Sequence, residues 1–114
     1  MRGILYIDKK RIKKELKTKI QLFADKLNKQ GIKIDQLLLF GSYTKGQAKP
    51  YSDIDLCVVS SKFGKDLIQE AADLRLISNT IDWRIEPHPF NPSNLKVIED
   101  PFIYQIKTTG IKII

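Results

Sequence analysis

The sequence predicts an α/β (α+β) domain in which a small mixed β-sheet is flanked by helices. Three observations support this fold class. Apolar residues recur at helical spacing between residues 9 and 30, an uninterrupted apolar run covers residues 36 to 40, and a β-rich run covers residues 54 to 60. Helices interleaved with short apolar strands are typical of a sheet that packs helices on its faces.

Residues 9 to 30 are predicted to form one long helix. Asp8 has the side chain of an N-cap, and Gly31 stands where a glycine commonly follows the end of a helix. A short edge strand is predicted before this helix, over residues 1 to 7. The apolar stripe of the helix is expected to consist of Ile12, Leu16, Ile20, Phe23 and Leu27.

The first two core strands are predicted on either side of a polar segment. The run Gln-Leu-Leu-Leu-Phe at residues 36 to 40 is continuous and bounded by a turn and a Gly-Ser pair, which favours a buried strand. Residues 43 to 52 predict a helical turn followed by a loop. Residues 54 to 60 form the next strand, on which Cys57 is expected to be a buried packing residue.

The second half of the chain is predicted to contain further helices and a last strand. Residues 92 to 107 indicate short helical pieces that begin near Pro92, and residues 110 to 114 indicate a small edge strand. Residues 65 to 77 predict a helix whose inward side consists of Leu67, Ile68, Ala71, Leu74 and Ile77.

A third strand is predicted over residues 80 to 86, where polar and apolar residues alternate. Pro87 and Pro89 are expected to stop it, because proline cannot donate to a strand ladder. In this arrangement Trp83 faces the core. His88 is expected in a rigid surface loop between the two prolines, and the alternative is a metal-binding or acid–base role.

Composition favours one basic globular domain over residues 1–114, with a motif core at about residues 36–90. The net charge of +7 and the pI of 9.5 favour polyanionic partners such as nucleoside triphosphates, nucleic acid or an acidic protein. One N-terminal stretch is either a docking face or the solvated side of a helix. Its basic residues are Lys9, Lys10, Arg11, Lys13, Lys14, Lys17 and Lys19.

The expected location is the cytoplasm. Cys57 is the single cysteine, so no internal disulfide can form, which fits a reducing compartment. The chain opens with Met1-Arg2-Gly3 and lacks the apolar run of a signal peptide. No apolar run approaches the roughly 18–20 residues of a membrane span, so no membrane association is predicted.

Gly41 and Ser42 indicate a phosphate-binding turn. They follow a predicted buried strand and precede a predicted helix start. A glycine allows a ligand to approach the backbone closely, and the N–H groups at a helix start suit a phosphate. The Ser42 hydroxyl adds one further hydrogen-bond donor.

Asp53 and Asp55 indicate a divalent-metal site. Residues two apart on a strand share one face, and two carboxylates there repel each other unless a cation lies between them. Such hard oxygen ligands suit Mg²⁺ or Mn²⁺. If the third strand lies alongside, its acids complete a two-metal cage. The alternative is that both acids only solvate a turn and a strand edge.

These motifs resemble the minimal nucleotidyltransferases of the DNA polymerase β superfamily. The residues that carry the resemblance are Phe40-Gly41-Ser42, Ser52-Asp53-Ile54-Asp55-Leu56 and Ile81-Asp82-Trp83-Arg84. The resemblance implies that Gly41 and Ser42 hold an incoming triphosphate. Lys45 either screens the charge of this triphosphate or is a plain surface lysine. The resemblance also implies that Asp53 and Asp55 bind two Mg²⁺ (or Mn²⁺) ions.

By the Ile-Asp-x-Arg pattern, the resemblance implies that Asp82 is the third catalytic and metal-binding carboxylate. Glu86 is the alternative, since it shares the predicted face, and Arg84 either contacts phosphate or holds Asp82 in place. The implied function is metal-dependent transfer of a nucleoside monophosphate, AMP from ATP, to a hydroxyl group. Hydroxyl groups of protein side chains are among the candidate acceptors.

A second function comes from a different class. Stand-alone proteins of this kind resemble antitoxins that pair with a small helical HEPN-type toxin, and such a chain would act by binding with little or no catalysis. A weaker alternative, a nucleic-acid-binding module, rests on the net charge alone and predicts a steep salt dependence of binding.

Overall fold

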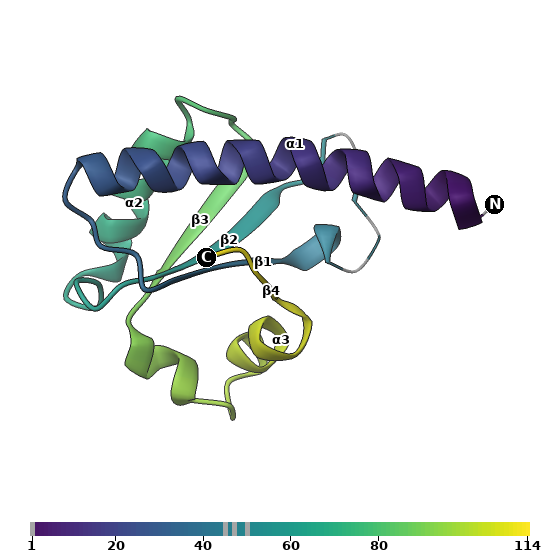
Figure 1. Ribbon diagram of the computed structural model, residues 1–114. Helices are drawn as coiled ribbons and strands as arrows, with labels where there is room; N and C mark the ends of the chain where they lie inside the picture. Colours follow the sequence, from purple (N-terminus) through teal and green to yellow (C-terminus); the bar gives the residue numbers. More distant parts are fainter. Residues whose placement is uncertain (1, 45, 47, 50) are drawn as a thin grey trace.

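The computed structural model describes residues 2–44, 46, 48–49 and 51–114, with the side chains of the first helix described from Lys14 onward. Within these residues a four-stranded sheet has the order β3-β2-β1-β4 (Figure 1). β1 is antiparallel to both of its neighbours, and β2 is parallel to β3. The strands are β1 (Gln36–Phe40), β2 (Ile54–Val59), β3 (Ile85–Phe90) and β4 (Ile111–Lys112).

Helices cover both faces of this mixed sheet, which confirms the predicted fold class. One face packs against α1 (Arg2–Lys29) and α2 (Leu67–Ser78). The other face packs against the 3₁₀-helix η2 (Pro92–Lys96) and α3 (Pro101–Thr109). Figure 1 shows α1 lying across the sheet on the side away from α3. Among the described helices, none is long and apolar enough to cross a membrane.

Helix α1 is longer at its start than the sequence predicts. It begins at Arg2, so the expected strand over residues 1 to 7 is wrong, and Asp8 lies inside the helix instead of capping it. Residues 4 to 30 contain neither glycine nor proline, so nothing in this stretch interrupts helical hydrogen bonding. The predicted stripe is confirmed where side chains are described, at Leu16, Ile20, Phe23 and Leu27.

The end of α1 agrees with the prediction. Gly31 has a φ of 81°, its N–H donates to Asn28 O, and the N–H of Ile32 donates to Leu27 O. These two hydrogen bonds form a Schellman motif, in which the left-handed residue is normally glycine. The turn directs the chain from α1 into β1.

Replacing Gly31 with alanine is expected to lower the free energy of unfolding by about 1 kcal/mol, because an L-residue is strained at this positive φ. A Cβ at this position would meet no atom within 4 Å, so the cost comes from the backbone alone. Urea unfolding measures the change. Lys29→Ala, in the last turn of the same helix, is the control and is expected to change stability by less than about 0.5 kcal/mol.

Strand β3 is displaced from its predicted position. It covers residues 85 to 90 and contains the two prolines that were expected to stop it. The Arg84 carbonyl accepts a hydrogen bond from the N–H of Ile54, and the Phe90 carbonyl accepts one from the N–H of Ser60. The backbone N–H and C=O groups of every second residue from Arg84 to Phe90 therefore point towards β2. The nitrogens of Pro87 and Pro89 therefore face the open edge of the sheet, where no donor is needed.

The expected burial of Trp83 and of the start of α2 is also wrong. Residues 80 to 84 form a turn instead of a strand, which leaves Trp83 66% exposed and outside the core. In α2, Leu74 and Ile77 are buried as predicted, but Leu67 and Ile68 are exposed. Ile68 lies about half a turn from Ile77 around the helix axis, so both cannot face the sheet.

Candidate active site

Gly41 closely approaches Asp55, the second residue of β2. β1 ends at Phe40, whose register partner is Asp55, and the short 3₁₀-helix η1 (Gly41–Tyr43) follows. Gly41 has a φ of 78°, and a Cβ there would lie less than 3.0 Å from Asp55 Oδ2. Only glycine allows this backbone conformation and this proximity of a carboxylate together.

The two aspartates are held at the start of β2. Asp53 directly precedes the strand and is exposed, while Asp55 lies within it with a side chain that is 25% exposed. Ile54 and Leu56 point to the opposite face and are fully buried under α1 and α2. This alternation confirms the predicted amphipathic strand and leaves the acids on the face that α3 covers.

Glu86 on β3 is the register partner of Asp55. Adjacent strands lie about 4.8 Å apart, so the two acidic residues are direct neighbours on one face of the sheet. The Glu86 carboxylate forms an ion pair with Arg75 of α2, and this side chain is 38% exposed. The ion pair turns the Glu86 carboxylate towards α2 at the β3 edge of the sheet, where it remains partly exposed to solvent.

His88 lies on β3 beside Asp55, whereas the sequence favoured a surface loop for it. It lies on β3, two residues after Glu86, and its Nε2 is 3.4 Å from Asp55 Oδ1. Its ring packs against Phe40 and Phe102, with centroids 5.4 and 5.8 Å away. The period-2 spacing of Glu86 and His88 is a usable sequence signal for this shared face once the strand continues through Pro87 and Pro89.

Cys57 is the register partner of His88, but it is not a second reactive group. The thiol is fully buried, as predicted, and burial raises its pKa to about 12. A thiol with this pKa stays protonated at neutral pH and packs as a small apolar side chain.

Asp82 lies apart from this cluster, in the turn between α2 and β3. Its side chain is 7% exposed, and its Oδ2 accepts from Lys19 Nζ at 2.6 Å and from Arg84 Nη2 at 2.8 Å. Among the described residues its contacts are with these cations and not with Asp53 or Asp55. Hydrogen bonds from Arg84 and Lys19 hold the pKa of Asp82 well below its usual range.

Replacing Asp82 with asparagine is expected to lower the free energy of unfolding by about 2 kcal/mol at neutral pH, because two cations lose a nearly buried anion. The folded-state pKa of Asp82 is depressed, so its contribution is complete above the unfolded pKa of about 4 and declines at lower pH. The difference between wild type and variant should therefore shrink below about pH 4.

Urea unfolding between about pH 2 and pH 7 tests this expectation. The matched control is Asp73→Asn, which alters an exposed carboxylate of α2 that accepts from Gln69. A pH-independent difference between wild type and Asp82→Asn would contradict the assigned role of the ion pairs.

The remaining predicted phosphate ligands are placed as follows. Ser42 is the second residue of η1, half-buried, and among the described residues its hydroxyl has no hydrogen-bond partner. The N–H groups of Ser42 and Tyr43 are in the first turn of η1, where no intrahelical acceptor exists. Arg84 hydrogen-bonds to Asp82, and its Nη1 is 3.4 Å from Tyr43 Oη. Lys45 lies outside the described residues.

The donor set at this end of β2 has the chemistry of a site for a hard cation. Asp53, Asp55 and Glu86 supply carboxylate oxygens, which Mg²⁺ and Mn²⁺ prefer. The absence of a Cβ at Gly41 gives the Asp55 carboxylate its place beside the turn. Within the described residues no three acidic, histidine or cysteine side chains are clustered closely enough to hold an ion as they stand.

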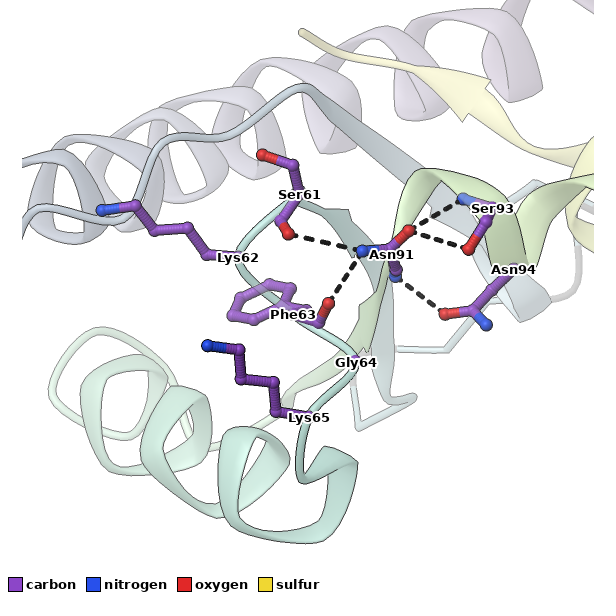
Figure 2. A pocket seen from close by; sticks show the side chains of 8 residues that line it. All are labelled: Ser61, Lys62, Phe63, Gly64, Lys65, Asn91, Ser93 and Asn94. Carbon is purple, nitrogen blue, oxygen red and sulfur yellow. Dashed lines mark hydrogen bonds between the residues drawn. The ribbon is translucent and has the colours of Figure 1, made fainter.

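A polar hollow of about 790 Å³ lies at the other end of β2 from Asp55 (Figure 2). It is bounded by residues 61 to 65 and by the start of η2. Asn91 lines it, and there its Nδ2 donates to the Ser61 and Phe63 carbonyls and its Oδ1 accepts from Ser93. Lys62 Nζ donates to Gly31 O. These groups hold the loops together, far along the strand from Asp55.

Comparison with known families assigns the chain. The model of the nucleotidyltransferase domain matches residues 9–107. The chain belongs to this nucleotidyltransferase family. The match confirms the resemblance carried by the Gly-Ser turn and the paired aspartates, and it supports transferase chemistry as the general class. Nucleotidyltransferase domains generally use divalent metals, which agrees with the oxygen donors at β2.

Solved structures confirm the nucleotidyltransferase fold. A provisionally assigned nucleotidyltransferase from Sulfolobus solfataricus aligns over 95% of this chain and 84% of its own, with a TM-score of 0.61 and 14% identity. A toxin–antitoxin structure with AMP-PNP aligns over 86% of this chain and 72% of its own, with a TM-score of 0.58 and 22% identity. Curated proteins give no match. At these identities the structural likeness establishes the fold alone.

Proposed function

We propose that this nucleotidyltransferase domain moves a nucleoside monophosphate from a triphosphate, with ATP as the expected donor, to a hydroxyl acceptor. Two Mg²⁺ or Mn²⁺ ions would be held by Asp53, Asp55 and Glu86. The single observation that supports this most strongly is the contact between Gly41 and Asp55, because it joins the phosphate turn to the acidic strand. The family assignment supplies the reaction class.

In the proposed reaction the Gly41–Ser42 turn binds the triphosphate. The Ser42 hydroxyl, which has no partner among the described residues, and the N–H groups at the start of η1 donate hydrogen bonds to phosphate oxygens. The acceptor oxygen forms a bond to the α-phosphorus while the bond to pyrophosphate breaks, and the hydroxyl proton passes to a carboxylate at the site. The bound divalent ions would neutralise phosphate charge and acidify the acceptor hydroxyl.

We assign the third carboxylate to Glu86 instead of Asp82. Two observations support this choice. Glu86 is the register partner of Asp55 on the adjacent strand, whereas the Asp82 carboxylate is already paired with Lys19 and Arg84. A nearly buried anion between two cations has few lone pairs left for a metal ion, and we assign Asp82 and Arg84 to holding the turn before β3.

Glu86→Gln is expected to lower the rate of nucleotidyl transfer by about a hundredfold, because a carboxylate that helps to deprotonate the acceptor is lost. Label transfer from α-labelled ATP in the presence of Mg²⁺ measures the rate. Arg75→Gln is the matched control, since it breaks the same ion pair but keeps the carboxylate, and it should stay within about threefold of wild type.

If Glu86 is the third carboxylate, the loss of the Asp82 carboxylate should have little effect on nucleotidyl transfer. Asp82→Asn, compared per folded molecule, should retain transfer within about tenfold. A loss confined to Asp82→Asn, with Glu86→Gln fully active, would return the role to Asp82.

A second candidate function is that of an antitoxin-like partner of a small helical HEPN-type protein. One observation favours it: a toxin–antitoxin structure with AMP-PNP has the same fold. Transfer assays with and without the purified partner distinguish the two functions. Stable binding with no label transfer supports the binding role, and label on the partner supports catalysis. A transfer rate that is unchanged by Asp53→Asn and Asp55→Asn would refute the enzymatic proposal.

A further inference from the structure

A groove runs between α1 and the β4 edge of the sheet, away from the acidic strand. Its volume is about 420 Å³, which is within the range of ligand and peptide pockets. The apolar lining consists of Leu16, Ile20, Leu39, Ile111 and Ile113. Leu16, Ile20 and Leu39 are buried at its base, whereas Ile111 on β4 is 36% exposed. The base is therefore continuous with the main core.

Three lysines border this apolar surface. Lys14 and Lys17 lie three residues apart on one side of α1. Lys112 lies across the groove on β4, and its register partner is Leu38, so its side chain leaves the strand on the face that α3 covers. All three are exposed, and none has a carboxylate partner within the described part of the chain. An aliphatic base bordered by unpaired cations matches a ligand that is apolar in the middle and acidic on its flanks.

The backbone at the edge of the groove favours an extended ligand. β4 is an edge strand of the described sheet, and the N–H of Ile113 donates to Leu37 O. Because antiparallel pairing alternates, the N–H and C=O of Lys112 face away from β1. An open edge of this kind can pair with a strand from another chain, which supplies main-chain affinity beside side-chain pockets.

The groove is separate from the acidic strand. The Leu39 side chain belongs to the core under α1, whereas Asp55 lies on the face that α3 covers. A segment seated in the groove would therefore leave Asp55 and Glu86 uncovered. Binding at the groove and chemistry at β2 can be altered independently.

We propose that the α1–β4 groove docks an extended acidic segment of a partner protein. The segment places aliphatic side chains in the groove beside Lys14 and Lys17, pairs its backbone with the edge of β4, and presents acidic side chains to these two lysines and to Lys112. The proposal does not depend on nucleotidyl transfer. It supplies a surface for the binding role and explains the unpaired positive charge on this side of the molecule.

The test uses synthetic peptides as probes. A fluorescein-labelled peptide with alternating glutamate and leucine is compared with one that has serine for leucine and one that has lysine for glutamate. Fluorescence anisotropy at low salt should show the glutamate–leucine peptide binding at least about tenfold more tightly than either of the others. Backbone NMR shifts caused by this peptide should centre on Leu39, Ile111 and Ile113.

Charge-reversal variants locate the binding. Lys14→Glu, Lys17→Glu and Lys112→Glu combined should weaken binding by at least about tenfold, since each rim pair contributes modestly. The matched control reverses three exposed lysines elsewhere, Lys29, Lys33 and Lys96, and should weaken binding less than threefold. Thermal unfolding establishes that both triple variants are folded, and Ile111→Ser provides a single-site alternative that removes the apolar contact.

Several outcomes would overturn the proposal. Equal losses in the two triple variants would show diffuse charge attraction, and preference for the lysine peptide would exclude an acidic partner. Shifts centred away from the groove, or shifts caused only by self-association, would identify another occupant or another surface. Asp55→Asn should bind the peptide like wild type. The peptide-binding assay therefore tests docking at the groove independently of the label-transfer assay, which tests the proposed chemistry at β2.

Discussion

Asp55→Asn is expected to lower nucleotidyl transfer by about a thousandfold or more, which corresponds to about 4 kcal/mol of transition-state stabilisation. Asp55 is the acid that links the phosphate turn to β3. Its Oδ2 lies against Gly41, its Oδ1 is 3.4 Å from His88 Nε2, and its register partner is Glu86. Label transfer from α-labelled ATP at saturating Mg²⁺ measures the loss.

The same variant is expected to be no less stable than wild type. Like charges directly opposite each other on neighbouring strands are destabilising, so removing one from the Asp55–Glu86 pair relieves repulsion. Asp73→Asn again serves as the control, with unchanged activity and stability. Full activity in Asp55→Asn, or a large loss of stability, would mean that the carboxylate is structural.

Gly41→Ala is expected to reduce transfer by at least about a hundredfold. Two effects combine: an L-residue is strained at a φ of 78°, and its Cβ would displace the Asp55 carboxylate. Displacement of a catalytic group by about 1 Å is enough for such a loss. Steady-state transfer kinetics on the folded variant provide the measurement.

Gly31→Ala is a close control for Gly41→Ala. The two glycines have nearly the same φ, 81° and 78°, but only Gly41 has an atom where a Cβ would stand. Both variants should lose stability, whereas only Gly41→Ala should lose activity at a temperature where both are folded. Equal activity in the two variants would contradict the claim that Gly41 makes room for Asp55.

The elements that depend only on short-range sequence patterns could be predicted from the sequence. The stripe from Leu16 to Leu27, the apolar run at residues 36 to 40 and the end of α1 at Gly31 all depend on short-range rules, and each was found as expected. The position of β3 was not predictable in this way. Pro87 and Pro89 would end a strand only if their nitrogens faced a neighbouring strand. The tertiary fold decides this, and here the neighbouring strand lies on the other side of β3.

The position of β3 also decides which acidic residue lies next to Asp55. With the strand placed too early, Asp82 and Glu86 shared a face, and Asp82 was preferred from its motif. The observed strand begins at Ile85, which pairs Glu86 with Asp55 and leaves Asp82 in a turn beside Lys19. The contact between His88 and Asp55 depends on the same register. By contrast, the turn at Gly41 and the spacing of Asp53 and Asp55 were visible in the sequence because they are local.

The most direct test of the account locates the metal ion itself. Mn²⁺ added to the ¹⁵N-labelled protein with ATP broadens the amide signals of nearby residues. We expect the broadening to centre on Gly41, Ser42, Asp53, Asp55 and Glu86, and to be lost in Asp55→Asn. Broadening centred on the turn at Asp82, or none near β2 with nucleotide present, would contradict this expectation.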